Sequence, residues 1–535
     1  MSLFQRAISI FTLVVVLLSS AAVYAKETPS QRLLRREISY MISRIKSPET
    51  IKAIEVYSRK GRQAIYRAHS GLLLNPASNL KIITTSFALH SLGSDYIFTT
   101  PFEFEGVQRA DTLIGNLVVV GNGDPILSLS DLDSAARGIY EDGIRVITGD
   151  LVIDESKFDS LRWGAGWMWD DEPEPYAMFI GPTSFNHDVI TVNLSLDSSA
   201  QTLVVTTSPK TEFVDIEDNA VPGTKDSVFV TRRMIRDINT IVVSGTYTSG
   251  FIRDTRDFSI RYPGQYFGTV LRELLTKHGI DVLGRLVVTR HYSDHSPGVQ
   301  AFSLMHPIDT VLTYTNKVSD NLGAECFLRE VPLATSGQTG SAENGIKLEE
   351  QFLELCGVDS SQYYIVDGSG VSHYDLVTPN AIVKVLRFDL DQPYAGLFMK
   401  SLPVAGFDGT LEKRMTQDYV RGKVHAKTGS INGVRTLSGY VILPRDTLVF
   451  SMMFQNYVAD GDSMDALQDS ICSVLAQYSP NSRTFSRNLR KYRIGTYGIT
   501  HHRWKQSIRR KDSPALNRKE QSGPTRKSPV PSKKR

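Results

Sequence analysis

Asn75-Pro76-Ala77-Ser78-Asn79-Leu80-Lys81 opens a predicted helix, and apolar residues continue it to Leu89. Pro76 suits the first turn of a helix, where the backbone N–H that proline lacks would be left unpaired. Ser78 and Lys81 are three residues apart, so their side chains lie on one helical face and can touch. A serine needs a base beside it to become a good nucleophile, and this spacing supplies one.

Two further short motifs follow in a fixed order, Ser319-Asp320-Asn321 and Lys427-Thr428-Gly429. Each motif alone is weak, because Ser-x-x-Lys is usually a helix surface, Ser-Asp-Asn often caps a helix, and Lys-Thr-Gly is usually a turn. In this order they are typical of a single acyl-transfer cleft. The sequence therefore predicts that a helix, a loop and a strand, far apart in the chain, converge on one site.

The pattern around these motifs predicts an α/β (α+β) fold, an antiparallel sheet flanked by helices. Predicted strands cover 53–57, 63–67, 437–443 and 448–454, and a closing amphipathic helix covers 462–478. The third motif lies on the strand that precedes the last hairpin. Between about 100 and 290 the chain is rich in short strands and turns, which indicates an inserted β-rich region.

A length of 535 residues is too great for one ordinary core, and a hydrophobic content of 41% is typical of globular proteins. We therefore expect several domains. The predicted division is a signal peptide at 1–25, a discontinuous catalytic domain at 26–95 and 290–480, a β-rich insertion of one or two domains at 96–289, and a basic disordered tail at 481–535.

The N-terminus has the pattern of a secretory signal peptide. Arg6 precedes an apolar run at 8–18, and the small-residue exit Val23-Tyr24-Ala25 predicts cleavage before Lys26. The apolar run is short for a transmembrane helix, although a retained N-terminal anchor is the alternative. Export through a cleaved signal would place the mature chain in the periplasm or another extracytoplasmic compartment.

Three cysteines in a chain of this length exclude a disulfide framework. One pair could form, and Cys326 with Cys356 is the most plausible. The absence of Cys-x-x-Cys or Cys/His ligand spacing favours buried thiols that pack as small hydrophobes.

The net charge of +3 hides a strong asymmetry along the chain. Residues 481–535 contain 17 Lys or Arg against Asp512 and Glu520, a net charge of +15, so residues 1–480 carry −12. The composition of this tail predicts disorder. An anionic envelope polymer or membrane surface is the expected partner, a merely solvated extension is the alternative, and nucleic acid is not expected.

With these motifs the chain resembles the low-molecular-mass class C penicillin-binding proteins, the D-alanyl-D-alanine carboxypeptidase and endopeptidase family. Ser78 and Ser319 are 241 residues apart, and Ser319 and Lys427 are 108 apart. In this family the long interval between the first and second motifs contains extra domains, whereas serine β-lactamases have a much shorter interval there. The segments 121–125, 166–171 and 367–372 are also family-like. The resemblance covers about 30–480 and implies a penicillin-binding transpeptidase-like fold.

The resemblance implies a role for each motif residue. Ser78 would form an acyl-enzyme, with Lys81 as the base, its pKa lowered by burial and by Lys427. Ser319 would relay the proton to the leaving amine. Asn321 would hold the substrate backbone and Lys81.

Further positions would bind substrate. Lys427 and Thr428 would bind the terminal carboxylate, Gly429 would leave room along the strand, and the backbone amides of Ser78 and Ser430 would form the oxyanion hole. Three rim residues are also candidates for substrate binding: Asp171, Tyr176 and Asn432. The first two match positions that meet the free amine of the stem-peptide diamino acid, although packing alone would also explain aromatics in this segment.

The expected activity is that of a serine-type D-alanyl-D-alanine carboxypeptidase, and possibly an endopeptidase, acting on peptidoglycan stem peptides. β-Lactams are expected to acylate the same serine. We expect no metal and no organic cofactor. The alternatives are a β-lactamase-like hydrolase, which would release its acyl group quickly, and a non-hydrolytic muropeptide-binding envelope protein.

Overall fold

The computed structural model describes residues 27–45, 49–197, 199–236, 239–291, 298–458 and 461–494. The predicted signal peptide at 1–25 lies outside the described residues. No helix among the described residues is long and apolar enough to span a bilayer.

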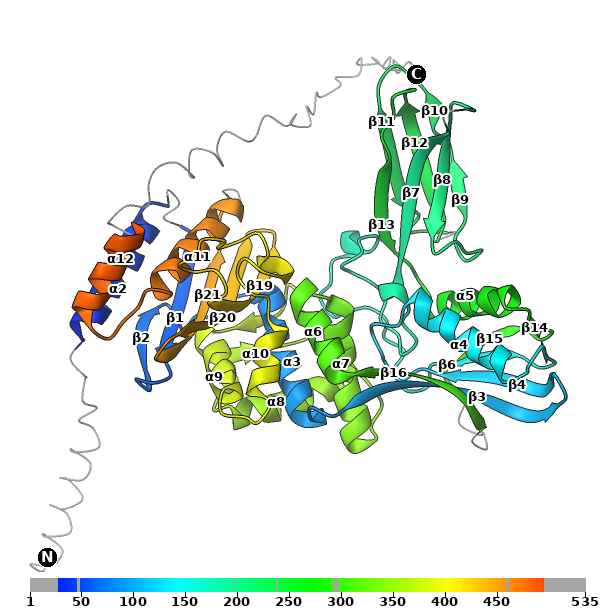
Figure 1. The fold of residues 1–535 in the computed structure, drawn as a ribbon, viewed down its shortest axis with the longest axis horizontal. Helices are drawn as coiled ribbons and strands as arrows, with labels where there is room; N and C mark the ends of the chain where they lie inside the picture. The colour runs from blue at the N-terminus through cyan, green and yellow to red at the C-terminus, as the bar shows by residue number, and fades with distance from the viewer. Residues whose placement is uncertain are drawn as a thin grey trace, which may run out of the picture.

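A five-stranded antiparallel sheet forms the centre of the catalytic part of the chain, in the order β19-β20-β21-β1-β2 (Figure 1). Its strands are β1 (Ile51–Ser58), β2 (Gln63–Ala68), β19 (Val424–Ile431), β20 (Val434–Leu443) and β21 (Asp446–Gln455). Hairpins β1–β2 and β20–β21 are those predicted from strand segments that flank short turns. Strand β19, which carries the third motif, and strand β2 lie at opposite edges of the sheet.

Helices cover both faces of this sheet, which explains why its inner strands are buried on both sides (Figure 1). One face packs against α2 (Pro29–Ser43), α11 (Gly461–Leu475) and α12 (Ser482–Tyr492). The other face packs against α3 (Leu80–Leu92), α6 (Ile308–Val318), α7 (Asn321–Ser336), α8 (Ala342–Leu355), α9 (Pro379–Asp389) and α10 (Ala395–Ser401). The first motif and the second lie on this second layer.

Helix α12 corrects the predicted start of the disordered tail at residue 481. Asn481 caps the helix by accepting a hydrogen bond from the backbone N–H of Thr484 at 3.0 Å. Phe485 and Leu489 are fully buried in the core that α2 and α11 share with the sheet. The composition of this segment predicts disorder because most of its residues are Arg or polar. The helix is stable only because its two apolar residues pack against the rest of the protein. Residues 495–535 lie outside the described residues.

The insertion is built from three sheets and two helices. A seven-stranded sheet contains β3 (Ile97–Arg109), β4 (Thr112–Val120), β5 (Val146–Ile147), β6 (Leu151–Asp154), β14 (Asp281–Val282), β15 (Leu286–Thr289) and β16 (Val299–Pro307), and it packs with α4 (Leu129–Glu141) and α5 (Pro263–Lys277). Two smaller sheets, which project as a separate lobe in Figure 1, contain β7 (Val189–Asp197), β8 (Thr202–Ser208), β9 (Ile216–Asp218), β10 (Val221–Pro222), β11 (Ser227–Arg232), β12 (Ile241–Tyr247) and β13 (Asp254–Ser259).

The predicted end of the insertion at residue 289 is wrong by one strand. Strand β16 pairs antiparallel with β3 along its length, so it belongs to the inserted sheet. The chain re-enters the catalytic part only at α6. The sequence pattern misses this because β16 and α6 follow each other without a turn residue other than Pro307.

All three cysteines are free, so the possible Cys326–Cys356 disulfide does not form. Cys326 and Cys472 are fully buried, in agreement with the predicted packing role.

Candidate active site

Ser78 lies in a tight turn that the rest of the cleft holds in place. The turn is the 3-10 helix η1 (Ala77–Asn79), which leads directly into α3. Ala77 has a φ of 44°, a conformation that non-glycine residues rarely adopt and that the surroundings must impose. The side chain of Asn79 donates to the backbone carbonyl of Lys427 at 2.9 Å. The nucleophile turn is therefore anchored to strand β19.

Strand β19 approaches the turn closely because it has glycine at position 429. A Cβ atom there would lie 2.1 Å from Thr436 Oγ1 and 2.9 Å from the carbonyl oxygen of Pro76. Any larger residue would push the strand away from Ser78. This is a physical reason for the glycine of the third motif.

Lys81 is fully buried and its amine has three hydrogen-bond partners. Nζ lies 3.0 Å from Ser78 Oγ, 2.5 Å from Asn321 Oδ1 and 2.7 Å from the carbonyl oxygen of Ser369. The amide oxygen and the carbonyl can only accept. A neutral amine would therefore donate its two protons to them and present its lone pair to the Ser78 hydroxyl. This geometry suits Lys81 to remove the serine proton.

The second motif lies at the junction of two helices. Ser319 ends α6 in the left-handed conformation, and Asp320 caps α7 by accepting from the backbone N–H of Gly323 at 2.6 Å. Asn321 donates from Nδ2 to the carbonyl oxygen of Tyr176 at 2.6 Å. That bond fixes the amide so that its oxygen faces Lys81.

Lys427 connects the second and third motifs. Its Nζ donates to Ser319 Oγ at 2.7 Å and to the carbonyl oxygen of Thr428 at 2.9 Å. The side chain of Thr428 donates to Thr410 Oγ1 at 2.8 Å. All three motifs therefore meet as predicted from their order, with Ser319 between one buried amine and the open cleft.

Burial lowers the pKa of both lysines. The pKa of Lys81 falls to about 8 because burial disfavours the charged amine, although four acidic residues oppose the shift: Asp367, Asp320, Glu325 and Asp375. The pKa of Lys427 is lowered, first by burial and then by repulsion from Lys81. The predicted direction for Lys81 is therefore right. Burial is the main cause of the lowered pKa of Lys81, and repulsion between the two ammonium groups adds to the lowered pKa of Lys427.

A loop at 367–372 aims the Ser369 carbonyl at Lys81. Asp367 accepts from the backbone N–H groups of Gly370 at 2.7 Å and Ser372 at 2.8 Å, and Glu325 accepts from that of Ser369 at 3.0 Å. Trp167, from the insertion, donates from Nε1 to Asp367 at 2.8 Å. The inserted region thus helps to orient Lys81 through this loop.

An open cavity of about 430 Å³ lies above Ser78. Seven predicted site residues line it: Ser78, Asp171, Tyr176, Ser319, Asn321, Ser430 and Asn432. Tyr176 donates from Oη to Asp171 at 2.7 Å, which brings the two predicted rim residues together. Lys81 and Lys427 are fully buried, and neither they nor Thr428 and Gly429 line this cavity.

Five lining residues were not among the predicted site residues: Gly370, Val371, His373, Ile431 and Arg435. The first three belong to or follow the segment 367–372, whose glycines signal a tight loop. Gly370 has a φ of +77°, and a Cβ there would lie 2.0 Å from the carbonyl oxygen of Ala77. Arg435 has no signal in the sequence, because only the β19–β20 hairpin brings it to the cleft.

A serine beside a buried lysine, with a second lysine and serine across the cleft, defines the class of serine acyl-transfer enzymes that use a lysine base. Residues 36–478 match the D-Ala-D-Ala carboxypeptidase 3 (S13) family. The chain belongs to this family.

Individual relatives agree with this assignment. The chain is 30% identical over 460 residues to a D-alanyl-D-alanine carboxypeptidase of Actinomadura sp. (strain R39), covering 83% of this chain and 85% of the relative. It is 26% identical over 395 residues to the D-alanyl-D-alanine carboxypeptidase DacB of Haemophilus influenzae, covering 72% and 81%. The crystal structure of penicillin binding protein 4 (dacB) from the same organism superposes with a TM-score of 0.73 at 22% identity, covering 82% of this chain and 99% of that one.

These findings confirm the predicted family and fold class, a mixed α/β penicillin-binding protein fold with antiparallel sheets. They also confirm that the chain is a serine-type D-alanyl-D-alanine carboxypeptidase, rather than either alternative.

Proposed function

We propose that the enzyme removes the terminal D-alanine of peptidoglycan stem peptides through an acyl-enzyme on Ser78. The observation that carries this proposal is the placement of Lys81 Nζ, 3.0 Å from Ser78 Oγ, with its other two partners able only to accept. Lys81 takes the hydroxyl proton as Ser78 Oγ bonds to the penultimate D-alanine carbonyl. The leaving D-alanine then needs a proton on its amine.

Ser319 and Lys427 supply that proton in the proposed mechanism. Ser319 lines the cavity and accepts a hydrogen bond from Lys427 at 2.7 Å, so a proton that leaves Ser319 Oγ is replaced from the amine behind it. Water then attacks the acyl carbonyl and gives a proton to Ser319, which passes it to Lys427 and so restores the amine that protonated D-alanine. The bond between the acyl group and Ser78 Oγ breaks, and the Lys81 ammonium returns its proton to Ser78.

The substrate lies along the outer side of β19 in this proposal. Lys427 and Thr428 bind its terminal carboxylate, Gly429 leaves room for its backbone, and the backbone amides of Ser78 and Ser430 stabilise the oxyanion, each donor contributing about 3–4 kcal/mol. Asn321 holds the substrate backbone, and Asn432 lies at the rim beside Ser430.

The direct test is release of D-alanine from a pentapeptide ending in D-Ala-D-Ala, compared with release from a purified cross-linked dimer. D-Alanine from the pentapeptide is the expected result, and cleavage of the dimer would add endopeptidase activity. In parallel, the acyl-enzyme formed with benzylpenicillin should persist over many minutes. An enzyme that hydrolyses benzylpenicillin quickly but leaves the pentapeptide intact would contradict the proposal.

We expect the rate of Ser78 acylation to rise with pH. The base is neutral Lys81, whose pKa is lowered to about 8, so its neutral fraction falls about tenfold per pH unit below 8 and saturates above it. The check is the second-order rate constant for acylation by a fluorescent penicillin between pH 6 and 10. A rate that is flat from pH 6 to 9 would show that Lys81 is not the titrating base.

We propose that Asp171 and Tyr176 bind the free amine of the stem-peptide diamino acid. Asp171→Asn is expected to raise KM about five- to tenfold for a substrate with this free amine, with little change in kcat, because one solvent-accessible ion pair is lost. A substrate with the amine acetylated should be insensitive. Tyr176→Phe, which removes only the hydroxyl that donates to Asp171, tests the second residue and should raise KM for the same substrate. Equal effects on both substrates would rule this role out.

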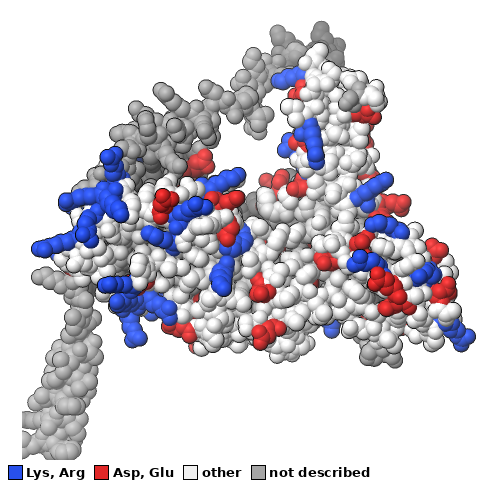
Figure 2. Space-filling view, viewed as in Figure 1, with Lys and Arg blue, Asp and Glu red and all other residues white. Residues whose placement is uncertain are grey.

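We also propose that the protein is exported to the periplasm or a similar compartment, and that its basic tail binds an anionic envelope polymer or membrane surface. Two findings support the second part. Residues 495–535 contain 12 Lys or Arg against two acidic residues. Figure 2 shows further basic side chains gathered over α2 and α12, to which Arg32, Arg35, Arg36, Arg483, Arg487 and Arg490 belong.

Two truncations separate tail binding from folding. A chain ending at residue 494 should keep its carboxypeptidase activity and lose most of its low-salt binding to isolated sacculi. A chain ending at 481 should also unfold at a lower temperature, because it removes Phe485 and Leu489 from the core. Unchanged sacculus binding by the 494 chain would contradict a role for the tail.

A further inference from the structure

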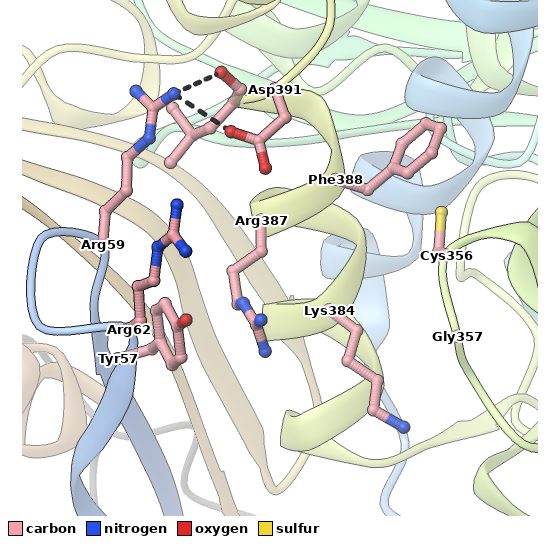
Figure 3. A pocket seen from close by; sticks show the side chains of 10 residues that line it. Tyr57, Arg59, Arg62, Cys356, Gly357, Lys384, Arg387, Phe388 and Asp391 are labelled. Atoms are coloured by element: carbon pink, nitrogen blue, oxygen red, sulfur yellow. Dashed lines mark hydrogen bonds and ion pairs between the residues drawn. The ribbon is translucent and has the colours of Figure 1, made fainter.

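A second pocket, of about 690 Å³, lies at the edge of the central sheet that is remote from the catalytic strand (Figure 3). Its walls are the turn between β1 and β2, the C-terminal half of α9 and the end of α8. It shares no lining residue with the cavity above Ser78. Strand β19 and strand β2 are the two edges of the sheet, so the pocket is a separate site.

Four cationic side chains line this pocket: Arg59, Arg62, Lys384 and Arg387. In Figure 3, Arg62 from the turn and Arg387 from α9 lie on either side of Tyr57 and extend in opposite directions in this view, and both line the pocket. The guanidinium of Arg387 lies 3.9 Å from the centre of the Tyr57 ring, which holds it flat and oriented. The cations therefore reach the pocket from two separate elements.

The charge of the pocket is largely uncompensated. Asp391 is the one acidic residue in its lining, and it pairs with Arg59 at 3.0 Å. Lys384 donates to a neutral partner, Gln362 Oε1, at 2.8 Å. Neither Arg62 nor Arg387 has a side-chain hydrogen bond or ion pair with any residue that the structure describes.

Lys384 has an acidic neighbour outside the lining, Asp359, whose carboxyl pKa is lowered first by hydrogen bonds from Ser361 and then by Lys384. Two other ionisable groups near the wall carry no compensating charge. Asp389, on α9, is buried and hydrogen-bonded to Ser86 at 2.6 Å, and burial raises its pKa to about 8. Burial also raises the pKa of the Cys356 thiol on the opposite wall, so that thiol is neither an anion nor a nucleophile at neutral pH. The pocket thus combines room for a ligand, two arginines without an acidic partner, Arg62 and Arg387, and an aromatic support.

We propose that this pocket binds a phosphate-bearing anion with two or more negative charges. Guanidinium groups recognise phosphate through paired hydrogen bonds, and a phosphate oxygen set can bridge cations from both walls. A single carboxylate has one charge and one plane of acceptors, which leaves one of the two arginines uncompensated. A diphosphate, or a ligand with several phosphate monoesters, carries enough negative charge to neutralise the pocket and is long enough to reach the cations on both walls.

Isothermal titration calorimetry of the full chain with sodium pyrophosphate, at ionic strength held constant with sodium chloride, tests the site. Arg62→Gln/Arg387→Gln should weaken binding about tenfold or more. Arg109→Gln, an exposed arginine in the β3–β4 hairpin, is the matched control and should bind as the wild type does. The basic C-terminal residues are present in every variant, so their contribution cancels. Unchanged D-alanine release confirms that the variants are folded.

Vesicles of cardiolipin, whose headgroup carries two phosphate charges, distinguish the source of the phosphate. Pyrophosphate binding that depends on Arg62 and Arg387 identifies a soluble phosphate ligand, and vesicle binding with the same dependence, without pyrophosphate binding, identifies a lipid headgroup. Both outcomes support the site. If the double variant unfolds, the single variant Arg62→Gln is used instead. The Arg62 side chain is exposed and makes no hydrogen bond or ion pair among the described residues, so its replacement should not destabilise the fold. Equal binding of both probes by wild type and variant, or no binding of either, would overturn the proposal.

Discussion

Replacing Ser78 with alanine is expected to abolish the covalent adduct with benzylpenicillin and to lower D-alanine release about 10⁴- to 10⁶-fold. The carbonyl carbon of the substrate then has no nucleophile, and the oxyanion donors and the two lysines can only bind it. Intact mass over time measures the adduct, and an amino-acid assay measures release.

The folded state should survive the change, because Ser78 Oγ is only one of three partners of Lys81. Ser94→Ala, at an exposed serine after α3, is the matched control and should acylate normally. An adduct of full stoichiometry in Ser78→Ala would show that another residue is the nucleophile.

Lys81→Met is expected to slow acylation about 10²- to 10⁴-fold, the usual contribution of a positioned general base. Methionine keeps the length and volume of the side chain but removes the amine that Ser78, Asn321 and Ser369 surround. Stopped-flow acylation by a fluorescent penicillin measures the loss.

A purely structural role for Lys81 would give a different result. If the amine is the base, the remaining rate in Lys81→Met should lose the rise with pH that the wild type shows toward pH 8. Thermal unfolding of the variant reports any structural loss separately. Lys347→Met, which replaces an exposed lysine paired with Glu343, should leave both rate and pH profile unchanged. A variant that keeps the wild-type pH profile would assign the base to another group.

Local sequence determines those parts of the site that depend on short-range geometry. The i, i+3 spacing of Ser78 and Lys81 places both on one helical turn in any fold that keeps the helix. Apolar segments joined by short turns specify the hairpins of the central sheet, and Gly429 marks the strand that must approach the turn carrying Ser78. The order of the three motifs then predicts a single cleft, and the structure places them together.

Tertiary structure decides what depends on contacts between distant segments. The pKa of Lys81 depends on complete burial and on four acidic residues from distant segments: Asp367, Asp320, Glu325 and Asp375. The Ser369 carbonyl faces Lys81 because Glu325, Asp367 and Trp167 hold its loop. Helix α12 exists because Phe485 and Leu489 find a core that α2 and α11 build, and β16 joins the insertion because β3 offers a free edge. Burial and strand pairing are properties of the assembled chain, so no local pattern specifies them. Local residues therefore determined the chemistry of this protein, and only the packed fold decided its electrostatics, its domain boundaries and its basic pocket.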